Sequence, residues 1–551
     1  MALEWDELLI GAPGRRWRTA STTRRVLVVV HNVTAATRLL DVVPLWAGDL
    51  RVQTVFSCVG SSAFTTGTTD FLGERGITPV DWEQAVRGDF DLAVTASYGG
   101  PLHEISAPLV VLPHGMGYNK FLKSREIQGN PVFGLSDAWL LHEGEVVPSV
   151  AVLSHHEQRD RLARYCPEAV PVALVAGDPC FDRMLASRPL RDSYRHRLGI
   201  DPDQRCVVIS STWGGDSLFG QHPSLVLRLA RQLPLDEYRV VVALHPNIWH
   251  GHSPWQVRMW LAECTRAGVV VLPPEEGWRA GLVAADLTIG DHGSVTFYSA
   301  ALGTPVLLAT WPEETVDPAS PIAALLRTAP RLDPHAPLAG QVDAAISAHR
   351  AADFADITDL ATSEPGRSAP LLRAEIYTRL ELEEPPAPAD SAAVPLPTAP
   401  PSGVGSQLVQ VRLADHAASV TRFPAAALDE PTTSGGVLVA CADEPDRRWL
   451  ELAEVLVHDD RYADPLRWVR SSLSRLPGCM LAATRDGAGH WVIGGADLPG
   501  TRVTGPADLG PVCAAVLHAW LCSGRSPREL PDQLRIILGQ REELVRLSTQ
   551  D

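Results

Sequence analysis

Short runs of apolar, largely β-branched residues recur along the first 180 residues and alternate with amphipathic stretches. RRVLVVV at 24–30 is followed by the helix-like AATRLLDVVPLWAGD at 35–49, and QRDRLARYC at 158–166 separates two later runs. Such runs predict buried parallel strands, and their alternation with helices predicts βαβ units in a doubly wound sheet. The other runs that we interpret as strands are 51–59, 91–97, 109–115, 138–144, 149–154 and 171–179.

A second series of the same kind begins near residue 205. Strand-like RCVVISS and YRVVVAL alternate with helix-like LVLRLARQLP and WQVRMWLAECTRAG, before VVVLPP, DLTIG and PVLLA. We therefore predict the fold class α/β, with two Rossmann-like domains at 22–182 and 195–350 that face one cleft. Ligands of such sheets bind at the carboxyl ends of the strands, so we expect His114 to lie across from His245 and Ser294.

The last third of the chain has a different pattern. Seven prolines between residues 385 and 401 predict an extended Pro-rich linker at 385–404, too poor in apolar residues to pack. A small α/β accessory domain is predicted at 405–551, and residues 1–384 should fold without it. Its expected strands are 408–414, 436–441, 479–486 and 490–496, the last two joined by a hairpin turn, and its expected helices are 447–460, 465–476, 513–524 and 532–548.

Charge and cysteine content narrow the function classes. The 48 basic and 65 acidic residues give a formal charge of -17, which argues against binding nucleic acid through a broad basic surface but allows a local pocket for a phosphorylated ligand. Nine widely spaced cysteines without a CxxC motif argue against a disulfide framework or structural zinc, and for a cytoplasmic protein. We expect no transmembrane helix and no signal peptide.

Lysine is almost absent from the chain. Lys120 and Lys123 are the only lysines among the 48 basic residues, and they lie close together. One interpretation is chance on a solvated turn. The other is a site that needs a compact ammonium where a planar guanidinium does not fit.

Candidate chemistry gathers in loops that directly follow the predicted strands. The loop at 290–294 reads GDHGS, in which Gly293 would allow a close backbone approach and Ser294 would cap a helix starting at Val295. A helix N-terminus there would offer free N–H groups to a phosphate, and Asp291 would accept a ligand hydroxyl or hold His292 in one tautomer. The alternative is an ordinary N-cap.

Two further loops suit an anionic ligand. SSTWGG at 210–215 combines hydroxyls with glycines after a strand, and His245 stands at a strand end before a proline. Their alternatives are a simple turn and a core histidine. Trp278 could stack on a base or pack in the core. No carboxylate or cysteine completes a ligand set near His245, so we expect no metal site.

Taken in order, these loops resemble those of GT-B transferases, and most closely the CDP-glycerol glycerophosphotransferase family, which makes teichoic-acid-type polymers. The resemblance spans roughly residues 24–350 and leaves 385–551 uncovered. It is carried by HGMGYNK (114–120), GDPCFD (177–182), STW (211–213), His245-Pro246 and DHGS (291–294) before an apolar helix.

The resemblance implies that the second Rossmann domain binds a nucleotide-diphosphate donor and that the first presents the acceptor. His114 would be the base that deprotonates the acceptor hydroxyl, and no tightly bound cofactor or metal would be needed. The resemblance does not identify the acceptor, which could be a polymer or a lipid-linked molecule. It also leaves open whether the protein contacts the inner face of the membrane. The implied catalytic residues are His114, His245 and Asp291, and the implied donor-binding residues are Ser211, Thr212, Trp213, Gly214, Trp278, His292, Gly293 and Ser294.

The sequence also departs from the family pattern. STWGG lacks the arginine of the family's Thr-Trp-Arg loop, DHGS replaces Asp-Tyr-Ser-Ser, and HGMGYNK spaces its lysine differently. Two alternatives therefore stay open beside the transferase: a sugar-nucleotide 2-epimerase-like enzyme, and a non-catalytic binding or regulatory protein on the same scaffold.

Overall fold

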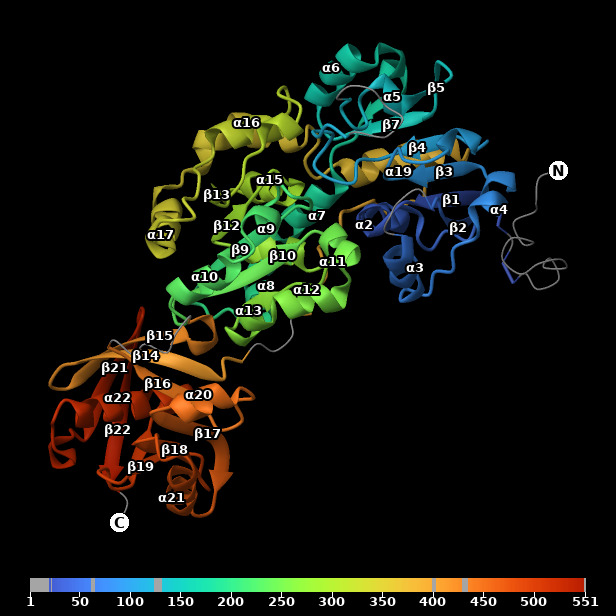
Figure 1. The fold of residues 1–551 in the computed structure, drawn as a ribbon. Helices are drawn as coiled ribbons and strands as arrows, with labels where there is room; N and C mark the ends of the chain where they lie inside the picture. Colours follow the sequence, from blue (N-terminus) through green and yellow to red (C-terminus); the bar gives the residue numbers. More distant parts are fainter. Residues whose placement is uncertain are drawn as a thin grey trace.

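Two parallel sheets form the body of the molecule, and a separate barrel lies at one end of it (Figure 1). The computed structural model describes residues 19–20, 22–60, 65–122, 131–398, 403–428 and 435–549. The body has the two Rossmann-like sheets of a GT-B-like protein, as predicted. Within these residues, no helix has the length and apolar character needed to cross a membrane.

The first sheet has six parallel strands in the order β2-β1-β3-β4-β7-β8. Strand β1, between β2 and β3, carries five consecutive buried residues from Val26 to Val30, which pack on both faces of the sheet. The strands are β1 (Arg24–Val30), β2 (Val52–Cys58), β3 (Leu92–Thr95), β4 (Leu109–Val111), β7 (Val150–Leu153) and β8 (Ala173–Val175), and the helices between them are α2 (Val33–Val42), α3 (Thr65–Gly73), α4 (Trp82–Arg87) and α6 (His156–Tyr165).

The predicted strand at 138–144 is wrong. These residues form a short helix, α5 (Asp137–Leu140), and a two-residue strand, β5 (Leu141–His142), which pairs with β6 (Glu145–Val146). Glu143 and Gly144 both have positive φ, 50° and 86°, so the chain reverses direction before the run reaches the length of a sheet strand.

The second sheet has five parallel strands in the order β11-β10-β9-β12-β13. The predicted alternation of strands and helices is observed here. The strands are β9 (Arg205–Ser211), β10 (Tyr238–Leu244), β11 (Val270–Val271), β12 (Leu287–Gly290) and β13 (Val306–Leu308). The helices are α7 (Pro179–Ser187), α8 (Arg191–Arg197), α9 (Leu218–Gln221), α10 (Leu225–Gln232), α11 (Pro246–His252), α12 (Pro254–Trp260), α13 (Ala262–Arg266), α14 (Trp278–Ala284), α15 (Ser294–Ala301), α16 (Pro321–Thr328), α17 (Leu338–Ala348) and α18 (Ala355–Thr358).

After the second sheet the chain returns to the first half. Helix α19 (Ser368–Arg379) buries Leu372 and Ile376 in the same apolar cluster as β1, and it lies beside β3 and β4 in Figure 1. The Tyr377 hydroxyl donates to Asp49 Oδ2 at 2.8 Å, which fixes the end of the helix. The chain therefore crosses between the two halves twice, once before β9 and once before α19.

The Pro-rich segment does not behave as the unpacked linker we predicted. Val394 is 3% exposed and belongs to the largest apolar cluster of the body. Its carbonyl accepts from the Tyr194 hydroxyl at 2.8 Å, and its N–H donates to Ser187 Oγ at 2.9 Å. One well-placed valine and backbone hydrogen bonds were enough to dock a segment whose average composition suggests a spacer.

The C-terminal domain is a closed barrel of nine strands, not the predicted small α/β domain, with strand order β14-β15-β21-β22-β20-β19-β18-β17-β16. Helix α22 (Gly510–Cys522) is buried along most of its length and shares an apolar cluster with the inward-facing strand residues. The strands are β14 (Ser406–Leu413), β15 (Ala417–Pro424), β16 (Val437–Cys441), β17 (Val455–Tyr462), β18 (Leu481–Asp486), β19 (Trp491–Gly495), β20 (Thr501–Thr504), β21 (Gln533–Leu538) and β22 (Arg541–Thr549), with α20 (Arg447–Leu452) and α21 (Pro465–Arg475) between them.

Two helix predictions in this domain are wrong. Residues 532–548 form the hairpin of β21 and β22, which turns at Gly539 with a φ of 55°, and the second half of 447–460 is strand β17. In β21 buried Leu534, Ile536 and Leu538 alternate with more exposed residues, so burial with a period of two overrides the helix propensity of the Leu, Arg and Glu residues. The predicted hairpin of β18 and β19 is observed.

The barrel is docked onto the second half of the body. Leu235 N–H donates to the Arg422 carbonyl at 2.9 Å, and the Arg422 guanidinium pairs with Asp236. Ala427 packs in the apolar cluster that contains α10. The contact is made through one edge of the barrel, around β15.

We predict that Val394→Ala lowers the free energy of unfolding of the body by about 2 kcal/mol, because two buried methyl groups are lost and a cavity remains. The matched control is Leu396→Ala two residues later, where the side chain is 48% exposed and the change should stay within about 0.5 kcal/mol. Urea unfolding of the full chain measures both. Equal, negligible effects would show that the segment is a free spacer.

Candidate active site

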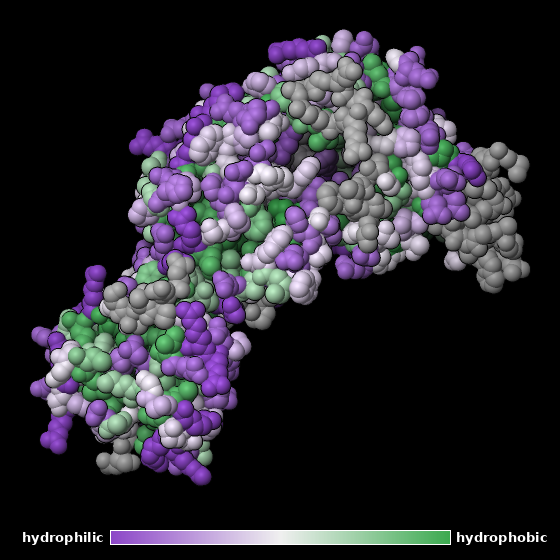
Figure 2. Space-filling model, in the orientation of Figure 1, coloured by the Kyte–Doolittle hydropathy of each residue, from purple (hydrophilic) through white to green (hydrophobic). Residues whose placement is uncertain are grey.

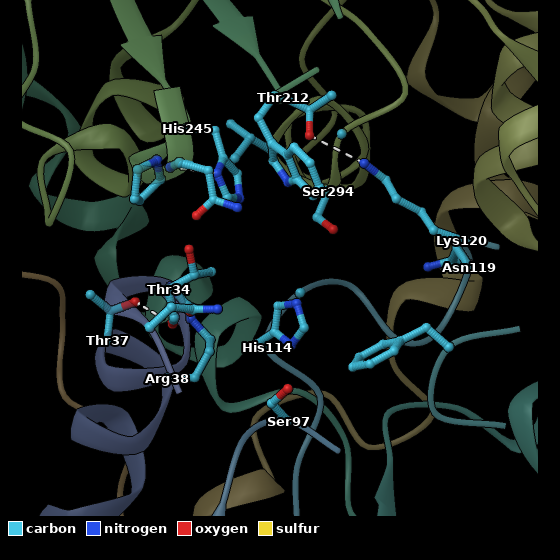
Figure 3. Close-up of a pocket in the computed structure, with 18 of the residues that line it drawn as sticks. Thr34, Thr37, Arg38, Ser97, His114, Asn119, Lys120, Thr212, His245 and Ser294 are labelled. Carbon is cyan, nitrogen blue, oxygen red and sulfur yellow. Dashed lines mark hydrogen bonds between the residues drawn. The ribbon is translucent and has the colours of Figure 1, made fainter. Parts of the chain in front are cut away.

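A cavity of about 640 Å³ lies where the carboxyl edges of the two parallel sheets meet. Figure 2 shows a hollow in the body, and Figure 3 shows the side chains that point into it. His114 projects toward Ser294, with His245 beside them, so the structure places these three predicted residues on one cavity. The loops that follow β1, β3, β4, β9, β10 and β12 all reach it.

The loop after β4 closes one side of the cavity by pairing with the second half. Lys120 forms an antiparallel bridge with Val316, and its Nζ donates to Thr212 Oγ1 at 3.2 Å. A Cβ on Gly115 would lie 2.6 Å from Ser294 Oγ, so any larger residue here would displace the Ser294 hydroxyl. The interpretation of Lys120 as a site residue fits this position, whereas Lys123 lies outside the described residues.

The ring of His114 is held in the tautomer of a base. Its Nδ1 lies 3.0 Å from the Ala96 carbonyl oxygen, which can only accept, so Nδ1 carries the proton and Nε2 keeps a lone pair. Burial lowers the pKa of His114 to about 4; the Ala96 carbonyl opposes the shift, and Arg38 and Lys120 add to it. The imidazole is therefore neutral at pH 7 and able to accept a proton.

His245 is held in the opposite tautomer. It is the N-cap of α11, and its Nδ1 accepts from the Asn247 N–H at 3.1 Å. The proton therefore sits on Nε2, which makes this atom a hydrogen-bond donor. Burial lowers the pKa of His245 to about 3, with Lys120 and His114 adding to the effect, so it is also neutral at pH 7. Two histidines on one cavity thus offer one acceptor and one donor.

Helix α15 opens onto the cavity without a side-chain cap. We expected Ser294 to cap a helix beginning at Val295, but the helix begins at Ser294, and Gly293 is its N-cap. Gly293 and Ser294 both line the cavity, and Ser294 Oγ points into it in Figure 3. The first N–H groups of this helix and its positive dipole end are therefore available to an anion.

Asp291 stands behind this turn and acts on the backbone. Its Oδ2 accepts from the Thr212 N–H at 2.8 Å and the Leu218 N–H at 2.9 Å, and its Oδ1 accepts from the Gly293 N–H at 3.0 Å. Burial raises the pKa of Asp291, although these N–H donors and Lys120 favour the ionised form. Asp291 is 1% exposed and its oxygens are occupied, so it ties the 211–218 loop to the 291–293 turn and does not reach a ligand.

The other predicted donor residues divide into two groups. Thr212, Trp213 and Trp278 line the cavity, and Trp278 stacks on Tyr298 with ring centroids 6.0 Å apart. Ser211 also lines the cavity, but its Oγ serves the loop: it donates to the Thr212 carbonyl and accepts from the Phe219 N–H. Gly214, with a φ of 96° in the turn, and His292, buried with Nδ1 unpartnered, are not among the lining residues.

Sequence reasoning missed the first strand-to-helix turn of the chain. His31 and Asn32 follow β1, and Thr34, Thr37 and Arg38 lie on the cavity-facing side of α2. The signal was present, because His31 ends an apolar strand as His245 does. The motifs of the resemblance begin at residue 114, so they do not include this turn.

The cavity wall is positively charged. The charge comes from Arg38 and Lys120, and the described lining residues include no aspartate or glutamate. This contrasts with the formal charge of -17 of the chain. In the described part of the chain, no cluster of three or more His, Cys, Asp or Glu side chains is arranged to hold a metal ion.

Comparisons with known proteins find likeness of fold. No protein-family model matches the chain, and no curated protein matches it. Among solved structures, the wall teichoic acid polymerase TagF with CDPG is similar over 66% of this chain and 89% of its own, at 11% identity and a TM-score of 0.45. The UDP-GlcNAc 2-epimerase of Neisseria meningitidis bound to UDP-GlcNAc covers 65% of this chain and 99% of its own, at 12% identity and a TM-score of 0.38. A glycosyltransferase of Rickettsia africae covers 66% and 99%, at 11% identity and a TM-score of 0.36.

We predict that Asp291→Asn destabilises the protein by about 1–3 kcal/mol, because an amide NH2 group cannot accept and leaves a buried N–H unpaired. Urea unfolding measures the loss. Ser294→Ala is the matched control: its hydroxyl faces the cavity, so stability should change by less than about 0.5 kcal/mol. Wild-type stability of Asp291→Asn would mean that the carboxylate serves a ligand instead of the loop.

Proposed function

We propose that this protein is a GT-B transferase that moves a glycerophosphate or sugar unit from a nucleotide-diphosphate donor to an acceptor hydroxyl. One observation carries the proposal. A cavity between two Rossmann-like sheets has cations and neutral donors on its wall and, in its described lining, no carboxylate. A wall of this composition suits a strongly anionic ligand such as a diphosphate, because none of its described lining residues carries a negative charge.

The second half has the groups that would bind the donor. The uncapped N-terminus of α15, the Thr212 hydroxyl and the Nε2–H of His245 all offer hydrogen bonds to phosphate oxygens. Trp278 lines the cavity and packs against Tyr298, and it would contact the nucleobase. Lys120 would add positive charge from the first half.

His114 would act as the general base. Its Nε2 takes the proton of the acceptor hydroxyl while the acceptor oxygen attacks the donor. For a glycerophosphate unit the new bond forms at phosphorus, and a nucleoside monophosphate leaves; for a sugar it forms at the anomeric carbon, and a nucleoside diphosphate leaves. The proton then passes from His114 to solvent.

A non-catalytic binding protein is the second candidate. Gly214 stands where the resemblance expects an arginine, and it lies outside the described cavity lining. Such a protein would bind a nucleotide without turnover. Thermal-shift measurements with CDP-, UDP- and GDP-linked donors, followed by product analysis with the donor that binds, separate the candidates. Transfer products support the proposal, an epimerised donor without acceptor indicates the epimerase, and binding without any product indicates the binding protein.

We predict that His114→Gln lowers kcat by roughly 10²–10⁴-fold and leaves donor affinity nearly unchanged, because the base acts on the acceptor hydroxyl. The matched control is His31→Gln. His31 also lines the cavity, but its Nε2 and Nδ1 both lie within hydrogen-bond distance of protein groups, so it cannot serve as the base. Steady-state kinetics and donor titration measure both variants. A parallel loss of donor binding in His114→Gln would contradict this division of roles.

The rate should be insensitive to moderate acid. The pKa of His114 is lowered to about 4, so the base stays unprotonated as the pH falls toward that value. We expect kcat/KM to show no acid limb between roughly pH 8 and pH 5, with circular dichroism confirming that the fold is intact. An acid limb near pH 6.5, the ordinary value for histidine, would show that the base is a solvent-exposed imidazole.

A further inference from the structure

Helix α2 presents an unpartnered polar face to the cavity. Arg38 is 8% exposed, and its Nε and Nη1 are buried without a hydrogen-bond partner among the described residues. One turn earlier Thr34 Oγ1 is buried and also without a partner. Both side chains line the cavity, and they lie side by side in Figure 3.

The position of Arg38 is fixed although its hydrogen-bonding groups are free. Its Nη1 lies 3.4 Å from Asp41 Oδ2, one turn along the same helix, in an ion pair without hydrogen-bond geometry. The guanidinium carbon lies 5.4 Å from the ring centroid of Trp278, which belongs to the second half. A cation over an aromatic face and beside a carboxylate is held in place, while Nε and Nη1 keep hydrogens without an acceptor.

Asp41 does not need Arg38. Arg279 donates from Nη1 to both Asp41 oxygens, at 2.8 and 2.9 Å, and Arg183 pairs with Asp41 as well. Burial alone would raise the pKa of Asp41, but the three arginines hold it below its usual value. The Arg38 guanidinium is the third beside Asp41, and its buried, unpaired N–H groups lower the stability of the fold. Neutralisation of Asp41 therefore does not explain why an arginine stands at position 38.

We propose that Arg38 binds the diphosphate of the donor, so that the first half of the protein supplies the guanidinium that the SSTWGG loop lacks. This rests on the proposed function. Trp278 contacts Arg38 and stacks on Tyr298 of α15, so the guanidinium lies on the α15 side of the cavity. Nε–H and Nη1–H lie on different edges of the guanidinium, so each can donate to a separate phosphate oxygen, and the Thr34 hydroxyl can donate to a third.

Calorimetric titration of the full-length protein tests this assignment. The probes are CDP, UDP and GDP, the parent nucleosides, inorganic pyrophosphate and glycerol 3-phosphate. Arg38→Gln should weaken binding of the diphosphates and of pyrophosphate roughly ten- to hundredfold and leave nucleoside binding unchanged. Arg38→Lys keeps the charge without the fork and should fall between the two.

Arg183→Gln is the matched control. Arg183 pairs with the same Asp41 but does not line the cavity, so its loss should shift the melting temperature and leave diphosphate affinity unchanged. If Arg38→Gln does not fold, Thr34→Val replaces it, with an expected weakening of diphosphate binding of roughly fivefold, as for a lost hydrogen bond.

Three outcomes would overturn the assignment: unchanged diphosphate binding in Arg38→Gln, equal loss of nucleoside and diphosphate binding, or a loss confined to glycerol 3-phosphate, which would place Arg38 at the acceptor. The proposed function fails separately. If the wild type binds diphosphates in an Arg38-dependent manner but forms no product with any donor, the transferase is wrong and Arg38 remains an anion-binding residue. If the wild type binds neither diphosphates nor pyrophosphate, both are wrong.

Discussion

Two reciprocal buried ion pairs hold the halves of the body face to face. Asp41 of the first half pairs with Arg279 of the second, and Asp317 of the second pairs with Arg161 of the first at 3.0 Å. All four side chains are nearly inaccessible to solvent. Removing one partner of a buried pair is destabilising, because the charge that remains keeps its desolvation cost and loses part of its compensation. The relative position of the two sheets, and with it the cavity, therefore depends on these pairs.

The chemistry of the cavity follows from backbone groups more than from side-chain clusters. The Ala96 carbonyl sets the tautomer of His114, and the N-terminus of α11 sets that of His245. The carboxylate oxygens of Asp291 accept hydrogen bonds from N–H groups of two loops. These bonds hold the carboxylate behind the cavity wall and bring Thr212 and Gly293 together. Cations and neutral donors are left to face the ligand.

The sequence predicted most of this body because buried parallel strands carry long apolar runs, and because functional loops follow the strands directly. It predicted His114, His245 and Ser294 on one cavity for the same reason. Asp291 was assigned to the ligand because the sequence cannot show which donors reach a carboxylate from residues 73 and 79 positions earlier in the chain. The role of Arg38 was invisible because it depends on how Arg183 and Arg279 share Asp41, which is decided by tertiary packing.

The barrel shows where the sequence pattern fails. Residues 532–548 mix Leu, Arg and Glu, which are strong helix formers, and their period-two burial becomes evident only when the partner strands are known. The burial of Val394 could not be predicted from the sequence either, because a single apolar side chain does not change the composition of a Pro-rich segment.

Hydrogen exchange measured by mass spectrometry on the full chain, with and without the nucleoside diphosphate that binds best among CDP, UDP and GDP, tests the central claim most directly. A diphosphate bound between the sheets should protect residues 31–38 and 114–120 of the first half together with residues 211–215 and 291–296 of the second. Protection confined to one half, or to the barrel at 406–549, would contradict the account.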